Sequence, residues 1–120
     1  MTPKIDLKLR LLCDDGIAMG PGKADLLDAI ARTGSISAAA RVMQMSYRRA
    51  WLLVDVMNRS FREPLVRSAA GGVQGGGAQV TEAGLHVLAQ FRSMESAAVA
   101  AAQEQMHRLS LLLRADSGEA

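Results

Sequence analysis

Two arginines stand at the start of a predicted helix, where side chains can reach a nucleic acid. The run Ser46-Tyr47-Arg48-Arg49 follows a short turn and leads into an apolar segment. Serine is a favoured N-cap residue, which places both arginines in the first turn of the helix. An arginine guanidinium matches the guanine edge and also phosphate oxygens. The run therefore predicts a helix whose N-terminal end contacts DNA, with Arg48 and Arg49 at base edges or phosphates.

A helix-turn-helix is predicted to position these arginines. The stretch Gly34–Phe61 reads as a short helix, a tight turn and a longer helix. The short helix is rich in alanine, and small side chains let a neighbouring helix approach closely. In this motif the second helix enters the major groove of DNA. We expect further DNA contacts from Ser35, Ser37, Ser46 and Tyr47, with Ser35 or Ser37 also capping the short helix.

The longer helix also carries an apolar stripe. Ala50, Val54, Met57 and Phe61 recur at spacings of four, three and four residues, which is typical of a buried helix face. The arginine-bearing start of the helix lies outside this stripe. We therefore expect the stripe in the core and the start of the helix at the surface.

A glycine-rich hairpin is predicted next. Residues 65–69 read as a strand, and GGVQGGGA at residues 71–78 leads into a second strand. The segment lacks the GxxxxGK[ST] pattern of a nucleotide-binding loop. After a helix-turn-helix such a hairpin is a wing, although a plain mobile hairpin is the alternative. As a wing, it would contact the flanking DNA backbone through Arg67, Gly75, Gly76 and Gly77.

The chain begins with a predicted strand and a first helix. Apolar residues at positions 5, 7, 9 and 11 alternate with charged ones, which indicates a strand with one buried face. Pro21 fits the first position of a helix and Gly34 the position just past its end.

A long helix is predicted from Thr81, its cap, to about Leu113. It would be about 50 Å long at 1.5 Å per residue, too long to bury its apolar face within one small domain. We expect it to pair with the same helix of a second copy, although it could instead fold back across its own domain. The predicted dimer contacts are Phe91, Met94, Ala98, Ala102, Met106 and Leu109.

Charge and composition restrict the partners. Six arginines between Arg41 and Arg67 face two acids, a local charge of 6 − 2 = +4, whereas the whole chain carries only +2. This distribution indicates a polyanionic partner that meets part of the surface. Cys13 is the single cysteine, so no disulfide framework is expected. Without a signal peptide or a run of about 18 apolar residues, we expect a cytoplasmic protein that does not contact membranes.

Catalytic chemistry is not expected. His86 and His107 are 21 residues apart and have no acid or cysteine at metal-ligand spacing. No Ser, His and Asp constellation or paired-carboxylate site stands out. We therefore predict a non-enzyme without a metal or cofactor.

The sequence resembles the N-terminal winged-helix domain of ModE-type molybdate-responsive transcription regulators. The resemblance covers about residues 20 to 95 and rests on the segments GSISAAARVMQMSYRRAW and VRSAAGGVQGGGAQVTEAGLHVLAQF. LysR-type DNA-binding domains are similar more distantly, through the scaffold and the T-E-A-G helix start. The resemblance implies a mainly α winged helix-turn-helix with a small β-hairpin, a short N-terminal strand and a long C-terminal dimerisation helix. It further implies a transcriptional regulator that binds an inverted-repeat site as a homodimer.

The chain departs from this family at two points. Gln44 occupies the turn where many helix-turn-helix proteins hold glycine. Nothing after the long helix resembles the strands of a molybdate-binding β-barrel, so we do not expect molybdate binding within this chain. We expect a DNA-binding domain at residues 1–80, and a dimerisation helix with a short tail at residues 81–120.

Two other functions compete with DNA reading. The chain could be a protein-interaction module that pairs through its long helix with another regulator. It could also sense a small oxyanion at a helix N-terminus.

Overall fold

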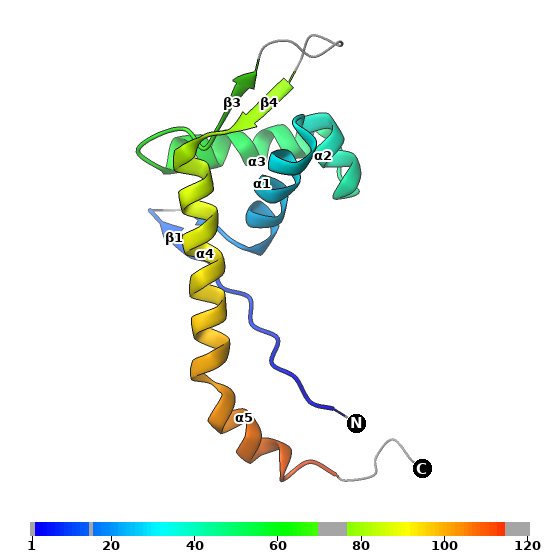
Figure 1. The fold of residues 1–120 in the computed structure, drawn as a ribbon, viewed down its shortest axis with the longest axis vertical. Helices are drawn as coiled ribbons and strands as arrows, with labels where there is room; N and C mark the ends of the chain where they lie inside the picture. The colour runs from blue at the N-terminus through cyan, green and yellow to red at the C-terminus, as the bar shows by residue number, and fades with distance from the viewer. Residues whose placement is uncertain (1, 15, 70–76, 115–120) are drawn as a thin grey trace.

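The computed structural model describes residues 2–14, 16–69 and 77–114. Within them lie five helices and two small antiparallel sheets. Most of these elements form a globular part, from which the later part of the C-terminal helical region projects (Figure 1). The molecule is elongated, with extents of 57 × 32 × 24 Å. The elements are β1 (Leu11–Cys13), β2 (Gly16–Met19), α1 (Pro21–Thr33), α2 (Ile36–Val42), α3 (Tyr47–Ser60), β3 (Val66–Ala69), β4 (Gly77–Val80), α4 (Glu82–Ala101) and α5 (Gln103–Ser110).

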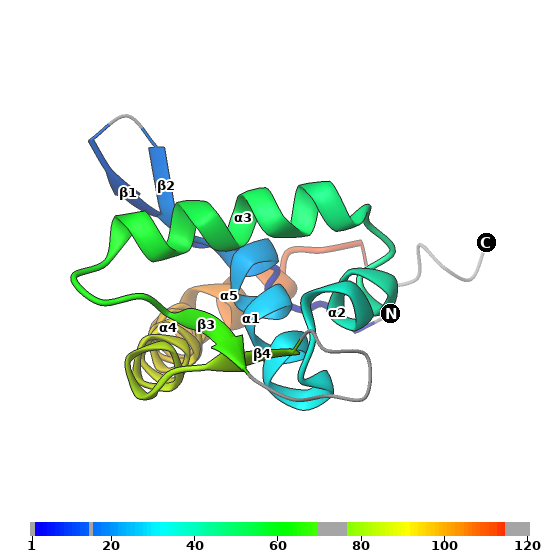
Figure 2. The same cartoon turned by 90° about the horizontal axis from the view of Figure 1, so that it is seen from above.

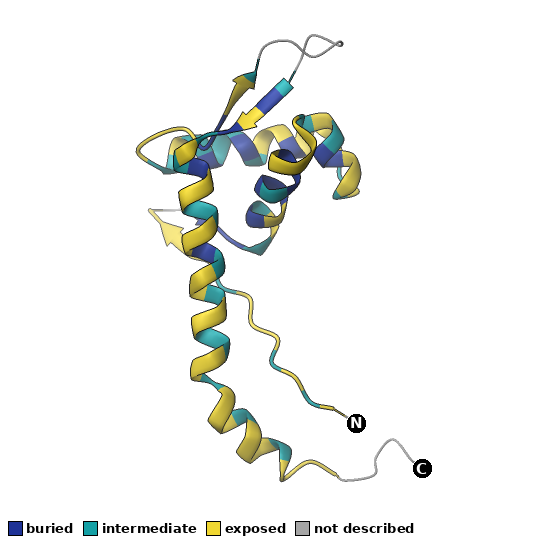
Figure 3. Ribbon diagram, in the orientation of Figure 1, coloured by how far each residue is buried: buried dark blue, intermediate teal, exposed yellow. Residues whose placement is uncertain are grey.

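The core lies where α1, α2 and α3 meet. Leu26, Leu27 and Ile30 of α1 are fully buried there. Figure 3 shows buried segments on α1 and α3 and in the strands of the hairpin. As predicted, α1 begins with Pro21, and Gly34 stands just past its end with a left-handed backbone, φ of 77°. The Gly34 N–H donates to the Ile30 carbonyl at 2.8 Å. Gly34 thus reverses the chain so that α2 can pack back on α1.

The turn between α2 and α3 completes the predicted helix-turn-helix. The Ser35 hydroxyl caps α2 by accepting from the Ala38 N–H at 2.8 Å, which decides between the two predicted caps. Ser46 caps α3 in the same way, accepting from the Arg49 N–H at 3.0 Å. Gln44 takes the left-handed conformation that glycine usually supplies, with φ of 57°.

The apolar stripe of α3 is confirmed as core. Ala50, Val54 and Met57 are buried, and Phe61 is partly buried at the C-terminal end of the helix. Together with Ala39 and Ala40 of α2, they allow close helix packing. Figure 2 shows α3 lying across α1 and α2 with its outer side uncovered.

The hairpin after α3 is confirmed by its two strands. β3 and β4 pair antiparallel from Val66 opposite Val80 to Ala69 opposite Gly77. The Ala78 N–H donates to the Gly34 carbonyl at 2.9 Å, which fastens the hairpin beside the end of α1. Gly75, Gly76 and most of the predicted glycine-rich tip lie outside the described residues.

The prediction of an N-terminal strand from Ile5 to Leu11 is wrong. Residues 2–10 carry no regular secondary structure, and β1 is restricted to Leu11–Cys13. These three residues are exposed and form a hairpin with β2. β2 is only four residues long, so the alternating segment before β1 finds no strand to pair with.

The prediction of one continuous long helix is also wrong. α4 ends at Ala101 and α5 spans Gln103–Ser110, with Ala102 between them at φ −95° and ψ 0°. The Ala102 N–H bonds to the carbonyls of Val99 and Ala100 instead of continuing the α-helical pattern. The helical region therefore bends at Ala102 and stops three residues before Leu113 (Figure 1).

The first half of α4 belongs to the globular part. Thr81 caps α4, as predicted, by accepting from the Gly84 N–H at 2.9 Å. Phe91 is 4% exposed and packs in the core. Arg92 donates to Asp25 of α1 at 2.7 Å and to Glu95 at 3.1 Å. These contacts raise the pKa of Arg92 further, with the Asp25 hydrogen bond as the largest cause.

Candidate nucleic-acid interface

The exposed face of α3 carries a row of side chains that begins at the N-terminal end of the helix and runs along its axis. Ser46 is the N-cap of α3, so the helix and this row of side chains begin directly after it. Arg48 and Leu52 are exposed on successive turns. Further along, Arg59 donates to Asp55 at 3.0 Å, so its charge is balanced within the helix. The N-terminal half of α3 therefore presents positive charge outward, as predicted.

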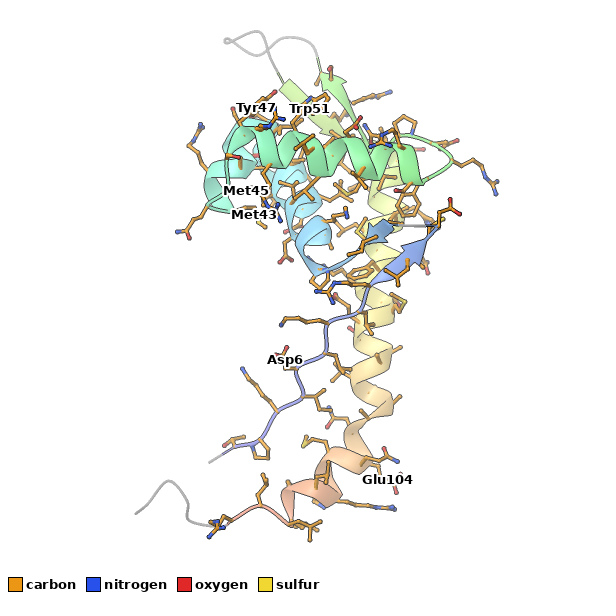
Figure 4. The ribbon with its side chains drawn as sticks, turned by 180° about the vertical axis from the view of Figure 1, so that it is seen from behind. Asp6, Met43, Met45, Tyr47, Trp51 and Glu104 are labelled. Atoms are coloured by element: carbon orange, nitrogen blue, oxygen red, sulfur yellow. The ribbon has the colours of Figure 1, made fainter. Side chains whose placement is uncertain are left out.

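A groove of about 560 Å³ runs along one flank of this row, between α2, α3 and the β3–β4 hairpin. Tyr47 and Trp51 line it and remain 55% and 48% exposed. Figure 4 shows both rings on the side of α3 that faces the hairpin. Ser35 and Ser37 line the opposite wall of the groove. Hydroxyl and aromatic groups of this kind can contact the sugar-phosphate backbone.

The hairpin supplies the third wall of the groove. Arg67 of β3 and Gly77 of β4 both line it. The Arg67 guanidinium is exposed and donates to the Gln79 side chain on β4 at 3.4 Å. The structure thus brings Ser35, Ser37, Tyr47, Arg67 and Gly77 to one groove.

Arg49 lies on the other flank of α3. It lines a separate hollow with Lys23 of α1. The pKa of Lys23 is lowered, first because the amine is partly buried and second because the Arg49 charge is near. The two predicted arginines therefore point to different regions: Arg48 lies on the outer row and Arg49 beside α1.

The predicted dimer contacts divide into three groups by their exposure. Phe91 is already buried in the core of its own chain, so its side chain is not free to meet a partner. Met94 and Leu109 are exposed by 42% and 62%. The others, Ala98, Ala102 and Met106, are half-buried.

Sequence reasoning missed three residues of this region. Trp51 lines the groove, Lys23 lines the hollow with Arg49, and Asn58 ties α3 to β3. A signal existed for Trp51, because an aromatic one turn after Tyr47 falls on the same side of a helix. Lys23 and Asn58 act through contacts with other elements, so no local pattern marks them.

Metal-binding and membrane-spanning features do not occur in the described residues. These residues contain no cluster of three or more His, Cys, Asp or Glu side chains placed to hold a metal ion. None of the helices in this part of the chain has the length and apolar character needed to cross a membrane.

Three packed helices followed by a two-stranded hairpin define a winged helix-turn-helix protein. The profile of the family described as "Bacterial regulatory helix-turn-helix protein, lysR family" matches residues 23–85, which is more than half of the chain. The chain belongs to this family. The match includes most of α1 and all of α2, α3, β3 and β4.

Relatives named ModE and MopA are similar to this chain over about two thirds of its length or more. The chain is 44% identical over 88 residues to "Molybdenum transport protein ModE" of Azotobacter vinelandii, covering 73% of this chain and 33% of that protein. It is 47% identical over 79 residues to "Molybdenum-pterin-binding protein MopA" of Rhodobacter capsulatus, covering 66% and 30%. It is 35% identical over 83 residues to "DNA-binding transcriptional dual regulator ModE" of Escherichia coli K12, covering 69% and 32%. The ModE-type resemblance is confirmed, and the chain spans about a third of the length of these relatives.

A solved structure confirms the fold. Full-length LysG from Corynebacterium glutamicum, with bound effector Arg, superposes with a TM-score of 0.54 at 23% identity. The superposition covers 76% of this chain and 29% of that one.

Proposed function

We propose that this chain binds double-stranded DNA with sequence specificity through the start of α3, and acts in transcription regulation. The observation that carries the proposal is the continuous exposed surface formed by the Arg48–Leu52 row of α3 and the groove beside it. An α-helix fits the major groove, and residues near its N-terminal end reach the base edges.

Arg48 is the base-reading candidate in this proposal. It stands in the first turn of α3, on its outer side, where the capping by Ser46 fixes the start of the helix. A bidentate arginine–guanine pair supplies about 1–3 kcal/mol of discrimination against a wrong base. Ser35, Ser37 and Tyr47 contact phosphates from the groove, and Arg67 holds the flanking backbone.

We further propose that two copies pair and bind an inverted repeat. Residues 1–80 form the DNA-binding part in this proposal, and the helical region from residue 81 forms the dimer contact through Met94, Ala98, Ala102, Met106 and Leu109. Support comes from the exposure of Met94 and Leu109 outside the core. Two recognition helices on a symmetric dimer then meet successive major grooves about 34 Å apart.

The test is a binding measurement with a selected site. An operator is obtained by in vitro selection, and binding to it and to a random duplex is followed by fluorescence anisotropy. Arg48→Ala should weaken binding to the selected site about 5- to 150-fold, consistent with 1–3 kcal/mol, and weaken random binding less. Arg108→Ala is the matched control, because Arg108 is an exposed arginine paired with Glu104 on the distant α5.

One outcome would contradict the whole proposal, and a second would contradict only its dimer part. Without a steep salt dependence of binding to any duplex, the DNA proposal fails. The exposed leucines after α5, Leu111, Leu112 and Leu113, would then favour a protein-interaction module. A monomeric mass by light scattering, with DNA binding retained, would remove only the homodimer and the inverted repeat.

A further inference from the structure

A second hollow lies on the flank of α3 that faces away from the hairpin. Its volume is about 340 Å³, and it lies between the N-terminal segment, the start of α1 and α3. Four of its lining side chains are cationic, and none is a carboxylate. We call it the basic hollow; its cations are Lys8, Arg10, Lys23 and Arg49.

These cations come from three segments and have little acidic compensation. Lys8 lies 3.4 Å from Asp6, in an exposed pair. Among the described residues, no ion pair joins Arg10, Lys23 or Arg49 to an acid. Like charges repel when they are brought together, and no acid pairs with these three cations to offset the repulsion. An anion bound in the hollow would balance their charge.

Two of the cationic side chains in the basic hollow are held in place by contacts with the backbone. The Lys23 amine donates to the Ile17 carbonyl at 2.8 Å, which fixes it against β2. The Arg10 stem lies over Gly20, where an added Cβ would stand only 3.4 Å from its Cγ. The lowered pKa of Lys23, from burial and the Arg49 charge, agrees with a crowded positive site.

The position of the basic hollow relative to the groove suggests what anion it meets. Successive α-helical residues turn by about 100°, which places Arg49 and Trp51 on opposite sides of Arg48. The groove beside the hairpin and the basic hollow have no lining residue in common. A helix about 10–12 Å wide nearly fills a major groove about 12 Å wide, so a phosphate backbone borders each flank.

We propose that the basic hollow binds a backbone phosphate of the DNA strand opposite the one held by the hairpin. The inference rests on the proposed DNA binding and deepens it, because α3 would then be held from both edges of the major groove. It assigns Arg49 to a phosphate rather than a base. Lys8, Arg10 and Lys23 join the interface, although they lie outside the helix-turn-helix.

The test compares salt dependences. Wild-type protein and the double variant Arg10→Gln/Lys23→Gln are titrated with selected and random duplexes between 50 and 200 mM salt. The variant should lose affinity for both duplexes by a similar factor, and its log–log salt slope should fall by about 0.9 for each phosphate that it no longer neutralises. Arg32→Gln/Arg108→Gln removes the same charge from sites outside the hollow and should keep the wild-type slope.

A second measurement locates the phosphate. Neutral methylphosphonates are placed one at a time along each strand of the selected site. Replacement at the contacted phosphate, on the strand away from the hairpin, should weaken wild-type binding and leave the variant nearly unaffected. Lys23→Arg, which keeps the charge, should retain most of the wild-type slope. Circular dichroism and thermal unfolding show whether each variant is folded.

The outcomes separate this inference from the function it rests on. A folded double variant with the wild-type slope overturns the basic hollow as a phosphate site while leaving DNA binding intact. Saturable binding of inorganic phosphate at constant ionic strength, lost in the variant without any change in DNA slope, assigns the hollow to a free oxyanion and overturns the DNA source. A wild-type protein without salt-dependent DNA binding overturns the proposed function and this inference with it.

Discussion

Asn58 of α3 binds Val66 of β3 at both of its backbone polar groups. The Asn58 Oδ1 accepts from the Val66 N–H at 3.1 Å, and its Nδ2 donates to the Val66 carbonyl at 2.9 Å. Oδ1 also accepts from the Leu65 N–H at 2.8 Å. The side chain thus occupies the place of a neighbouring strand beside β3. Through it, the helix proposed to read DNA and the hairpin beside it are held as one unit.

Asn58→Ala should therefore destabilise the fold. Val66 is only 3% exposed, so its freed N–H and carbonyl would be left without partners, at a cost of about 1–3 kcal/mol. The free energy of unfolding is measured by urea denaturation. Asn58→Asp keeps the acceptor but places a carboxylate oxygen against the Val66 carbonyl oxygen, so it should also destabilise the fold. An alanine variant as stable as the wild type would contradict this role.

Gln44→Gly should stabilise the turn between α2 and α3. A non-glycine residue at φ of 57° bears a cost of about 1–2 kcal/mol, and part of the gain is offset by the greater flexibility of glycine in the unfolded chain. The expected net gain is about 0.5–1 kcal/mol. Gln90→Gly, at an exposed position inside α4, is the control and should cost about 1 kcal/mol. Equal losses from both would show that Gln44 is not strained.

Gly84→Ala should weaken the junction between β3 and α4. A Cβ added at Gly84 would overlap the Leu65 carbonyl oxygen, a backbone atom that cannot move aside alone. Overpacking of this kind typically costs about 1–3 kcal/mol. Gly22→Ala is the matched control, because its Cβ would meet nothing within 4 Å and alanine favours the helix. Thermal unfolding of both variants decides the point, and an unchanged melting temperature for Gly84→Ala would refute the close approach.

Trp51 should report DNA binding by its own fluorescence. It is the single tryptophan of the chain, is 48% exposed and lines the groove beside the hairpin. Saturating DNA should change its emission and shield it from acrylamide, because the proposed backbone contact covers this groove. Trp51→Phe provides the blank for the DNA titration. Unchanged emission and acrylamide quenching, with binding shown by anisotropy, would place the DNA elsewhere.

The lowered pKa of Lys23 should appear as a pH dependence of stability. Burial and Arg49 disfavour the charged amine in the folded state, so the unfolded chain binds more protons between the folded pKa and the ordinary value of 10.5. The stability contributed by Lys23 therefore rises as pH rises through this window. The difference in unfolding free energy between wild type and Lys23→Gln should increase toward pH 10.5. A constant difference would contradict the lowered pKa.

Local signals predicted much of this fold. The caps at Ser46 and Thr81 and the helix end at Gly34 depend on residues within a few positions, and the structure confirms all three. The separate placement of Arg48 and Arg49 follows from helix geometry once the flanking elements are known. Lys23 and Asn58 act on residues brought near them by folding, which is why the sequence did not mark them.

The two wrong predictions concern the N-terminal strand and the long helix, and they fail for different reasons. An alternating pattern such as residues 5–11 becomes a strand only when a neighbour supplies hydrogen bonds, and β2 is too short to do so. The alanine-rich segment around Ala102 has high helix propensity and contains no proline or glycine, yet the helix breaks there. No local sequence rule accounts for that break.

The two ends of α4 differ in how they are connected to the rest of the molecule. At its start, the Thr81 N–H donates to the Leu65 carbonyl, and Leu65 is in turn held by Asn58 of α3. At its end, the backbone hydrogen-bond pattern is interrupted at Ala102. These hydrogen bonds connect the start of α4 to α3 through Leu65, so a tilt of α4 at this end would strain contacts that hold α3. A bend at Ala102 would instead move α5 without straining the contacts between α4 and α3.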